Sequence, residues 1–312
     1  MPISNYPSGF AQGISVRGMP LLNTYGGDVY WVNSATGSNG NKGTREKPFA
    51  TLDYAIGRCT ANNGDLILVA PNHAETITGV GGIAADVAGI TIVGLGVHNQ
   101  RPRFLMDGAT TVSFTVSAAD VAVKNCVFAS GHADVVTCFD VTAVGFTLED
   151  CDFTDNVADE NFKSCVAATG AANTADGMYI ARCRHLTADA ATLAFLLNTD
   201  DVEYLTFIDN VQICEGTGLA TMITCATGKD LKRCTILRNF LSSKATSGNL
   251  FISNDTASPN NSGIIAHNRC RHADVTGAHT MGAVGGCGFF DNLSASTDAV
   301  SGFVLPAIDV DL

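Results

Sequence analysis

The chain has 312 residues, and its 30 acidic residues outnumber its 18 lysines and arginines, which gives a formal net charge of −12. This charge argues against nucleic acid and against anionic membrane surfaces as partners. No apolar run approaches the about 18 residues of a membrane span. The first residues, MPISNYPSGFAQG, also lack the basic and apolar regions of a secretory signal. We therefore expect a protein that is made in a cytoplasm and has no nucleic-acid or membrane partner.

Residues 1–27 predict an extended N-terminal arm. They combine three prolines with several large apolar residues, and Arg17 is their only charged residue. A disordered linker would be poorer in apolar residues, and a stable monomer would not leave them in water. We expect the arm to lie on another subunit or a larger surface, or alternatively to fold back over its own chain. The residues expected to make this contact are Tyr6, Phe10, Arg17, Leu21 and Leu22.

Residues 28–312 predict a single domain that begins with a helical cap at 48–59. One face of the expected helix carries four apolar residues at helical spacing, which are Leu52, Ala55, Ile56 and Cys59. Thr51 is placed to cap the helix N-terminus. A turn then leads into an apolar strand at 66–70, and a further strand is expected at 88–96.

A short phrase recurs through the rest of the chain. It reads VAVKNCVF at 121–128, and each copy has alternating apolar residues, a polar residue, and then Asn or Cys. The Asn/Cys markers lie 25, 32, 27, 29, 29 and 24 residues apart. The seven markers are Cys126, Cys151, Cys183, Asn210, Asn239, Asn268 and Asn292. A period of this size is typical of repeat architectures.

The repeat unit is predicted to be made of strands. Its apolar residues alternate instead of recurring at three and four, and a second apolar run follows each marker after about ten residues. No amphipathic helix fits between the runs, which excludes βαβ units. One unit with two or three short strands is one coil of a parallel β-helix, so the predicted fold class is all-β.

The markers are expected to form a stacking ladder inside this fold. Asn at a bend can adopt the left-handed conformation and pass amide hydrogen bonds from coil to coil, whereas Cys is a small apolar residue that fits an inward position. The eleven cysteines include no CxxC pair, so we interpret them as reduced core residues and expect neither a disulfide framework nor a metal site. No cofactor is expected.

The segments GTREKPFATLDYAI, NGDLILVAPNHAETI and GITIVGLG, in this order, resemble the start of the pectin-lyase-like superfamily over residues 28–96. The resemblance implies a right-handed parallel β-helix. This superfamily includes polysaccharide lyases and hydrolases as well as phage tailspikes, so it leaves the function open. The stretch YPSGFAQGISVRGMPLLNTYGGDVYWV is also similar to uncharacterised phage proteins of the head and structural genes.

Two acidic clusters are candidates for catalysis on a glycan. The first comprises Glu149, Asp150 and Asp152, and the second is the run Asn198–Asp201, which is similar to motifs of polygalacturonase-like enzymes. Those motifs lie on successive coils, whereas here they are fused. We interpret the first cluster as a solvated or inter-subunit face and the second as turn residues. Four histidines without ligand spacing are interpreted as surface residues, namely His185, His267, His272 and His279.

The chain also has one tryptophan, Trp31, although sugar-binding grooves are usually lined with aromatic residues. Together these observations predict a protein that is not an enzyme. The function expected is a homotrimeric decoration or spike protein of a phage virion, held by its arm on the major capsid protein or another virion protein. The alternative is a tailspike-like enzyme that degrades polysaccharide, or a glycan-binding β-helix.

Deletion of residues 1–27 tests the role of the arm. We expect the truncated chain to keep its β-helix and to melt cooperatively, because the coils begin after the deleted segment. It should lose binding to undecorated particles in a pull-down, and Phe10→Asp should weaken this binding because it would bury an unpaired charge. Normal binding by the truncated chain would show that the arm is not the anchor, and unfolding would show that it belongs to the core.

Overall fold

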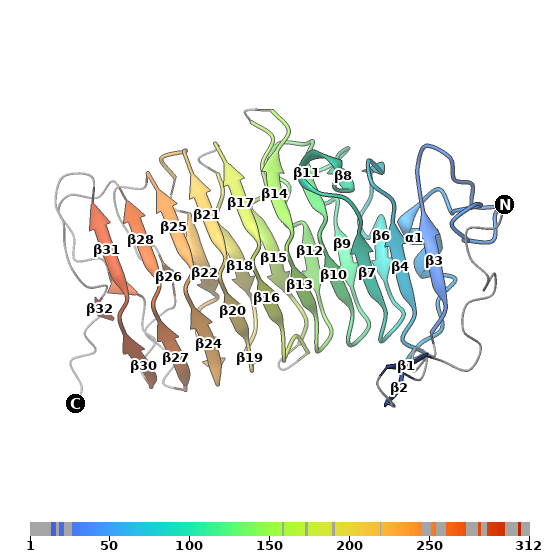
Figure 1. The fold of residues 1–312 in the computed structure, drawn as a ribbon. Coiled ribbons are helices and arrows are strands. Elements are labelled where there is room, and N and C mark those ends of the chain that lie inside the picture. Colours follow the sequence, from blue (N-terminus) through green and yellow to red (C-terminus); the bar gives the residue numbers. More distant parts are fainter. Residues whose placement is uncertain are drawn as a thin grey trace.

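The protein is seen in a computed structural model (Figure 1). The structure describes residues 14–16, 19–21, 27–157, 159–171, 174–188, 191–218, 220–244, 251–253, 260–272, 280–281, 286–296 and 305–306. These residues form a right-handed parallel β-helix, which confirms the predicted fold class. The coils follow one another along a single axis, with β3 at one end and β31 at the other.

Three parallel sheets run along the axis, and each of the coils from β4 to β26 contributes one strand to each of them in turn. Sheet 1 contains β3 (Val29–Val32), β4 (Leu66–Val69), β7 (Thr91–Gly94), β10 (Ala122–Lys124), β13 (Thr147–Glu149), β16 (Tyr179–Ala181), β20 (Thr206–Ile208), β24 (Cys234–Leu237), β27 (Gly263–Ala266) and β30 (Cys287–Phe290). Sheet 2 contains β5 (Ala74–Ile77), β8 (Arg103–Met106), β11 (Val127–Ser130), β14 (Asp152–Asp155), β17 (Arg184–Thr187), β21 (Val211–Cys214), β25 (Phe240–Ser243), β28 (Arg269–His272) and β31 (Leu293–Ser296). Sheet 3 contains β6 (Ile83–Ala85), β9 (Phe114–Val116), β12 (Phe139–Val141), β15 (Ser164–Ala168), β18 (Ala194–Asn198), β22 (Thr221–Cys225) and β26 (Ile252–Ser253).

The remaining strands form three short pairs. An antiparallel pair joins β1 (Ile14–Val16) to β2 (Met19–Leu21). Parallel pairs join β19 (Val202–Glu203) to β23 (Leu231–Lys232) and β29 (Thr280–Met281) to β32 (Leu305–Pro306). A 3-10 turn, η1, spans His98–Gln100.

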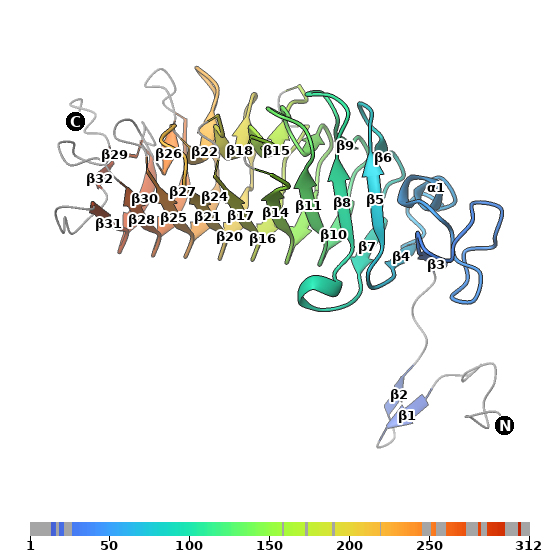
Figure 2. The same cartoon turned by 90° about the horizontal axis from the view of Figure 1, so that it is seen from above.

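A short helix, α1 (Leu52–Ile56), lies beside β3 at the N-terminal end of the coils (Figure 2). Its buried residues are Leu52, Ala55 and Ile56, as the spacing predicts. The side chain of Thr51 does not cap this helix, contrary to expectation. Its Oγ1 instead accepts a hydrogen bond from Asn39 Nδ2 at 3.0 Å, and Glu75 Oε2 accepts the first helical N–H, that of Leu52, at 3.0 Å. A carboxylate from the next coil thus ties the cap to the β-helix.

Phenylalanines fill the interior of the first half of the coil stack. On sheet 2, Phe104, Phe128 and Phe153 follow one another in register, and their rings stack at centroid distances of 5.4 and 5.7 Å. The next member of this inward column is His185, followed by Gln212. His185 is therefore not at the surface, as the sequence analysis expected, but fully buried. Strand alternation explains the difference, because His185 takes the position that phenylalanine holds in the preceding coils.

The seven marker residues lie in one buried column directly after the strands of sheet 1. The backbone N–H of Asn210 donates to Oδ1 of Asn239 at 2.9 Å, and the N–H of Asn239 donates to Oδ1 of Asn268, also at 2.9 Å. The side-chain Nδ2 of Asn239 donates to the carbonyl of Phe207 in the preceding coil at 2.9 Å. Nδ2 of Asn268 donates in the same way to the carbonyl of Ile236. The asparagines therefore satisfy backbone groups that no strand partner reaches.

The left-handed conformation belongs to the residue before each marker and not to the marker itself, which corrects the sequence interpretation. These preceding residues have φ between +53° and +57° and are Asn125, Asp150, Arg182, Asp209, Arg238, His267 and Asp291. We call them the turn column. The left-handed residue bends the chain between the strands of sheets 1 and 2, so its own side chain faces outward and the next residue faces the core. Each marker amide can then reach the coil beside it.

Asn239→Ala tests the ladder. The substitution leaves the buried N–H of Asn210 without its acceptor, and we expect a loss of about 1–3 kcal/mol in the free energy of unfolding. The measurement is chemical denaturation, with exposed Asn156→Ala as the matched control, which should change stability by less than about 0.5 kcal/mol. Equal losses for the two variants would contradict the role assigned to the column.

His185→Phe tests the buried imidazole. Desolvation lowers the pKa of His185 from 6.5 to about 3, so the unfolded chain takes up a proton below pH 6.5 that the folded chain does not. This group therefore lowers stability as the pH falls, by about 1.4 kcal/mol per pH unit between the unfolded and the folded pKa. We expect the Phe variant to lose stability less steeply than the parent between about pH 6.5 and 5, whereas exposed His98→Asn should keep the parent's slope. The same slope for His185→Phe as for the parent would contradict the assignment.

Candidate functional site

Most residues of the predicted arm lie outside the described part of the structure. Tyr6, Phe10, Arg17 and Leu22 lie outside the described residues, and Leu21 is described only as the last residue of β2. The role of the arm, the trimer and the virion partners therefore stay predictions.

The first acidic cluster is neutralised by basic side chains from neighbouring coils. Glu149 Oε2 lies 2.9 Å from Lys124 Nζ. Asp150 Oδ1 accepts a hydrogen bond from Arg182 Nε at 2.8 Å, and Asp152 Oδ2 accepts one from Arg101 Nη1 at 2.7 Å. Arg182 Nη2 also lies 3.5 Å from Glu149 Oε2, so all three carboxylates are held in ion pairs with basic side chains and do not form a paired acid and base.

The second acidic cluster lies at the turn between sheets 3 and 1 and is also paired. Asp200 Oδ1 is 2.7 Å from Lys229 Nζ, and this hydrogen bond lowers the pKa of Asp200. Burial alone would raise the pKa of Asp201, but the N–H of Asp230 and the ammonium of Lys232 at 3.0 Å lower it overall. Asn198 is buried and faces inward, away from both carboxylates. Asp200 and Asp201 are therefore ionised residues of a turn, in agreement with the interpretation of the sequence.

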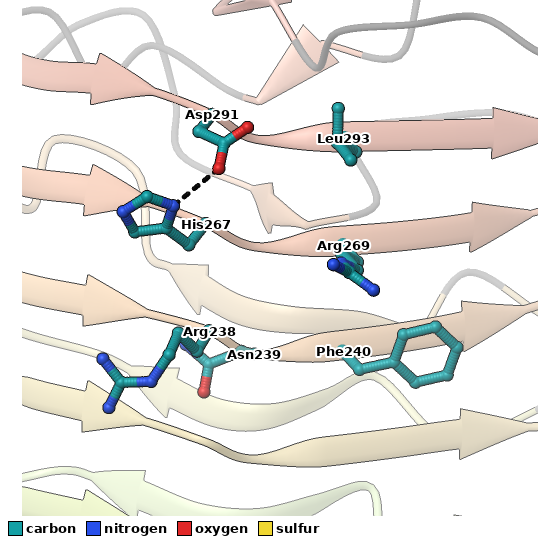
Figure 3. A pocket seen from close by; sticks show the side chains of 7 residues that line it. All are labelled: Arg238, Asn239, Phe240, His267, Arg269, Asp291 and Leu293. Carbon is teal, nitrogen blue, oxygen red and sulfur yellow. Dashed lines mark hydrogen bonds and ion pairs between the residues drawn. The ribbon is translucent and has the colours of Figure 1, made fainter.

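A different group of residues gathers around a pocket at the turn between sheets 1 and 2 (Figure 3). The pocket has a volume of about 740 Å³. Its lining residues are Arg238, Asn239, Phe240, His267, Arg269, Asp291 and Leu293. We call it the turn pocket. The turn column supplies three of these residues from successive coils, and the first outward position of each following sheet 2 strand supplies three more.

A histidine and an aspartate face each other in the turn pocket. His267 Nδ1 lies 2.7 Å from Asp291 Oδ2. A carboxylate can only accept, so in a neutral imidazole paired in this way Nδ1 carries the proton and Nε2 presents its lone pair. This pairing gives a histidine a fixed orientation and the capacity to take a proton. His267 is exposed, as expected from the sequence. Its pairing with Asp291 was not predicted.

Two arginines place positive charge beside this pair. Arg238 Nε and Nη2 donate to the two carboxylate oxygens of Asp209, both at 2.8 Å, so its charge is balanced by the preceding coil. Arg269 begins β28, two residues after His267. Among the described residues, no carboxylate lies within ion-pair distance of Arg269. Its guanidinium is thus the positive group that an anionic ligand in the pocket can use.

Apolar side chains complete the surroundings of the site. Phe240 and Leu293 lie on either side of Arg269 in register on sheet 2. Phe290, at the end of β30, is half exposed, and its ring meets that of His267 edge to face with centroids 5.9 Å apart. The low tryptophan content therefore does not mean that the surface lacks aromatic rings. Apolar and aromatic surfaces with a few charged groups are typical of ligand sites.

The signal for this site is present in the sequence but was not used. Each member of the turn column stands directly before a marker, so the markers align these residues in space. Reading that position from coil to coil gives Asp150, Arg182, Asp209, Arg238, His267 and Asp291, a run of charged or ionisable residues. The histidines look isolated when only their spacing along the chain is considered. His267 and Asp291 become neighbours only through their shared position in the coil.

A second pocket, of about 370 Å³, lies on the outer face of sheet 3. Most of its exposed lining is apolar and comes from side chains such as Val80, Val136 and Leu197. Its one carboxylate, Asp140, is hydrogen-bonded to Thr169. The described lining contains no histidine, lysine or arginine beside this carboxylate, so the turn pocket is the stronger candidate.

Other kinds of site find no support in the described part of the chain. No group of three or more His, Cys, Asp or Glu residues there is arranged to hold a metal ion. All eleven cysteines are described; nine are buried, Cys59 and Cys287 are half-buried, and none lies in a disulfide. No helix among the described residues is long and apolar enough to span a membrane.

Comparison with known proteins supports the fold. No protein-family model matches the chain, and no curated protein matches it either. A solved structure of a rhamnogalacturonan lyase is similar over 86% of this chain and 74% of its own, with a TM-score of 0.52 and 14% identity. A lacto-N-biosidase of family GH136 from Eubacterium ramulus covers 86% of this chain and 68% of its own, with a TM-score of 0.38 and 12% identity. At these identities the likeness concerns the fold alone.

These findings bear on two predictions made from the sequence. The expected resemblance to the pectin-lyase-like fold is supported by the structure of the rhamnogalacturonan lyase, whereas nothing found here supports the resemblance to phage structural proteins. The prediction that the protein is not an enzyme is corrected, because a solved structure that shares its fold is that of a rhamnogalacturonan lyase. Of the two functions considered, the findings favour the glycan-related alternative.

Proposed function

We propose that this protein binds a uronate-containing polysaccharide in the turn pocket and cleaves it by elimination. The observation that carries the proposal is the 2.7 Å contact between His267 and Asp291, in a pocket that also contains Arg269, whose guanidinium has no carboxylate partner among the described residues. The similarity of the fold to that of a rhamnogalacturonan lyase supports a carbohydrate substrate.

His267 is assigned the role of general base. In a uronate, the carbon next to the carboxylate carries a weakly acidic hydrogen. Nε2 of His267 removes this proton, the C–H electron pair becomes a C=C bond, and the C–O bond to the neighbouring sugar breaks with its electrons on oxygen. The leaving oxygen then takes up a proton from His267 or from water. Asp291 keeps the imidazole in the required tautomer and stabilises its charged form.

Arg269 is assigned to the substrate carboxylate. Removal of the proton places negative charge on a group that is already an anion, and a guanidinium bound to the carboxylate reduces this cost. The net charge of −12 does not prevent an acidic polymer from binding. In physiological salt the charges of the protein are screened beyond about 8 Å, so the local arginines decide the interaction.

The composition of the pocket favours elimination over hydrolysis. A glycoside hydrolase uses two carboxyl groups, one as acid and the other as base or nucleophile. The turn pocket contains one carboxylate, Asp291, and it is held by His267. Asp209 is occupied by both Arg238 nitrogens. A base, a charge-neutralising arginine and flanking apolar rings instead match the needs of elimination on a uronate.

Cleavage of polygalacturonate and alginate tests this function. We expect an ultraviolet-absorbing unsaturated product from at least one of these polymers and none from neutral dextran. His267→Ala should lower the rate by about 100-fold or more, because the positioned base is lost. Asp291→Asn and Arg269→Ala should lower it as well, whereas His98→Asn, at an exposed histidine far from the pocket, should leave it unchanged.

Three results would decide against the proposal as stated. An undiminished rate in His267→Ala would remove the assigned base. New reducing ends without an unsaturated product would indicate hydrolysis. Retention of the protein by a polyuronate gel without any product would indicate a glycan-binding β-helix that does not cleave.

A further inference from the structure

A second column of turn residues runs along the opposite edge of sheet 1 and holds an exposed tyrosine. The N–H of Gly177 donates to the carbonyl of Glu203, and the N–H of Tyr204 donates to the carbonyl of Lys232. These bonds place Gly177, Tyr204 and Arg233 on successive coils at the same position. All three have positive φ, namely +70°, +58° and +54°. Glycine adopts this conformation freely, whereas a bulky residue such as tyrosine is strained in it.

The tyrosine ring is held by its neighbours. Arg233 Cζ lies over the ring of Tyr204, 5.1 Å from its centroid, and the guanidinium of Arg233 is paired in turn with Glu203. Despite this contact, 56% of Tyr204 is exposed to solvent. The coil on the other side contributes Gly177, which has no side chain to cover the second ring face. The ring therefore stands at the surface in a fixed orientation with one face open.

We propose that Tyr204 and Arg233 form a remote sugar-binding subsite for the polysaccharide whose cleavage is assigned to the turn pocket. The inference rests on that proposed function. The open face of an aromatic ring carries partial negative charge and attracts the weakly positive C–H groups on the flat side of a sugar ring. Arg233 is paired with Glu203 through Nη1 but is exposed, so its remaining N–H groups can donate to the oxygens of a sugar beside the ring.

The path from this subsite to the turn pocket crosses the outer face of sheet 1. Tyr204 precedes β20 and Asp209 follows it. Five residue-to-residue steps, or about 16 Å of extended chain, therefore separate the two edges of sheet 1. Asp209 holds Arg238 of the turn pocket. The outward side chains in between, on β20 and β24, are uncharged and half-buried: Thr206, Ile208, Thr235 and Leu237. A polymer chain can lie across this smooth surface and reach both sites, whereas a short oligomer reaches only one.

Length-dependent binding tests the subsite. We compare polygalacturonate with trigalacturonate, by affinity electrophoresis and by calorimetry respectively, in the non-cleaving His267→Ala background. Tyr204→Ala should weaken binding of the polymer by about three- to tenfold and leave trigalacturonate binding unchanged, whereas Tyr204→Phe should bind both like the parent. In the otherwise native chain, Tyr204→Ala should raise KM for the polymer by a similar factor without changing kcat.

Gly177→Asn provides a second variant that keeps the tyrosine. Asparagine tolerates positive φ, and a Cβ at this position would meet no atom closer than 3.8 Å. Its side chain would stand beside the open ring face, so we expect the same loss of polymer binding as in Tyr204→Ala. Tyr54→Ala, at a partly exposed tyrosine of the cap helix, is the matched control and should bind normally. Thermal melting of each variant separates lost binding from lost folding.

The outcomes distinguish this inference from the proposed function. Cleavage that depends on His267, with polymer affinity unchanged in Tyr204→Ala, overturns the subsite and leaves the function standing. Polymer binding that depends on Tyr204, without cleavage, supports the subsite and overturns the elimination. A Tyr204→Ala variant that changes only self-association in sedimentation shows a protein contact instead and overturns the subsite. Absence of binding to polygalacturonate, alginate and dextran overturns both.

Discussion

The parallel stacking of coils places the same backbone groups above one another, and every buried group at a corner needs a partner from the next coil. At the turn between sheets 1 and 2 the strand ladders are interrupted, so the N–H groups of Asn210 and Asn239 have no partner in their own sheet. The amide side chain of the following coil supplies it, at 2.9 Å in both cases. At the asparagine corners one residue therefore turns outward in the left-handed conformation, and the next turns inward with an amide group that supplies this hydrogen bond.

The candidate site is a consequence of this corner. The outward residue of each turn is solvent-accessible, fixed in orientation and placed about 4.8 Å from its equivalents in the adjacent coils. Opposite charges at successive positions then stabilise the stack, as in the pairs of Arg182 with Asp150 and Arg238 with Asp209. Where the column ends in His267 and Asp291, the same geometry gives an oriented imidazole beside apolar side chains. A position that supports the fold thus also holds groups that can move a proton.

The sequence predicted the architecture well because the period and the strand alternation are properties of local segments. The seven markers occupy a single position in the coil, and the second apolar runs that follow the first five markers lie on sheet 3. The site could not be found in this way, because its members are about 24 to 29 residues apart along the chain and neighbours only after stacking. His185 and His267 show the difficulty, since the same residue type lies inside the fold in one coil and on its surface in another. A shift of one residue along the strand exchanges inward-facing and outward-facing positions, so the residue type alone does not show which histidine is buried.

The change from cysteine to asparagine along the marker column gives the two halves of the molecule different modes of coupling. Cys126, Cys151 and Cys183 contribute packing, which each coil retains to a large extent when a neighbour is lost. From Asn210 onward, each amide hydrogen bond is shared between two coils, so the loss of one coil leaves an unsatisfied group in the coil before it. The stability of a repeat protein is approximately the sum of the stability of each repeat and the interaction energy between neighbouring repeats. At this corner the interaction energy between neighbouring coils is larger toward the C-terminus. At this corner we therefore expect the C-terminal coils to depend on one another for buried hydrogen bonds, whereas the N-terminal coils depend on one another for packing.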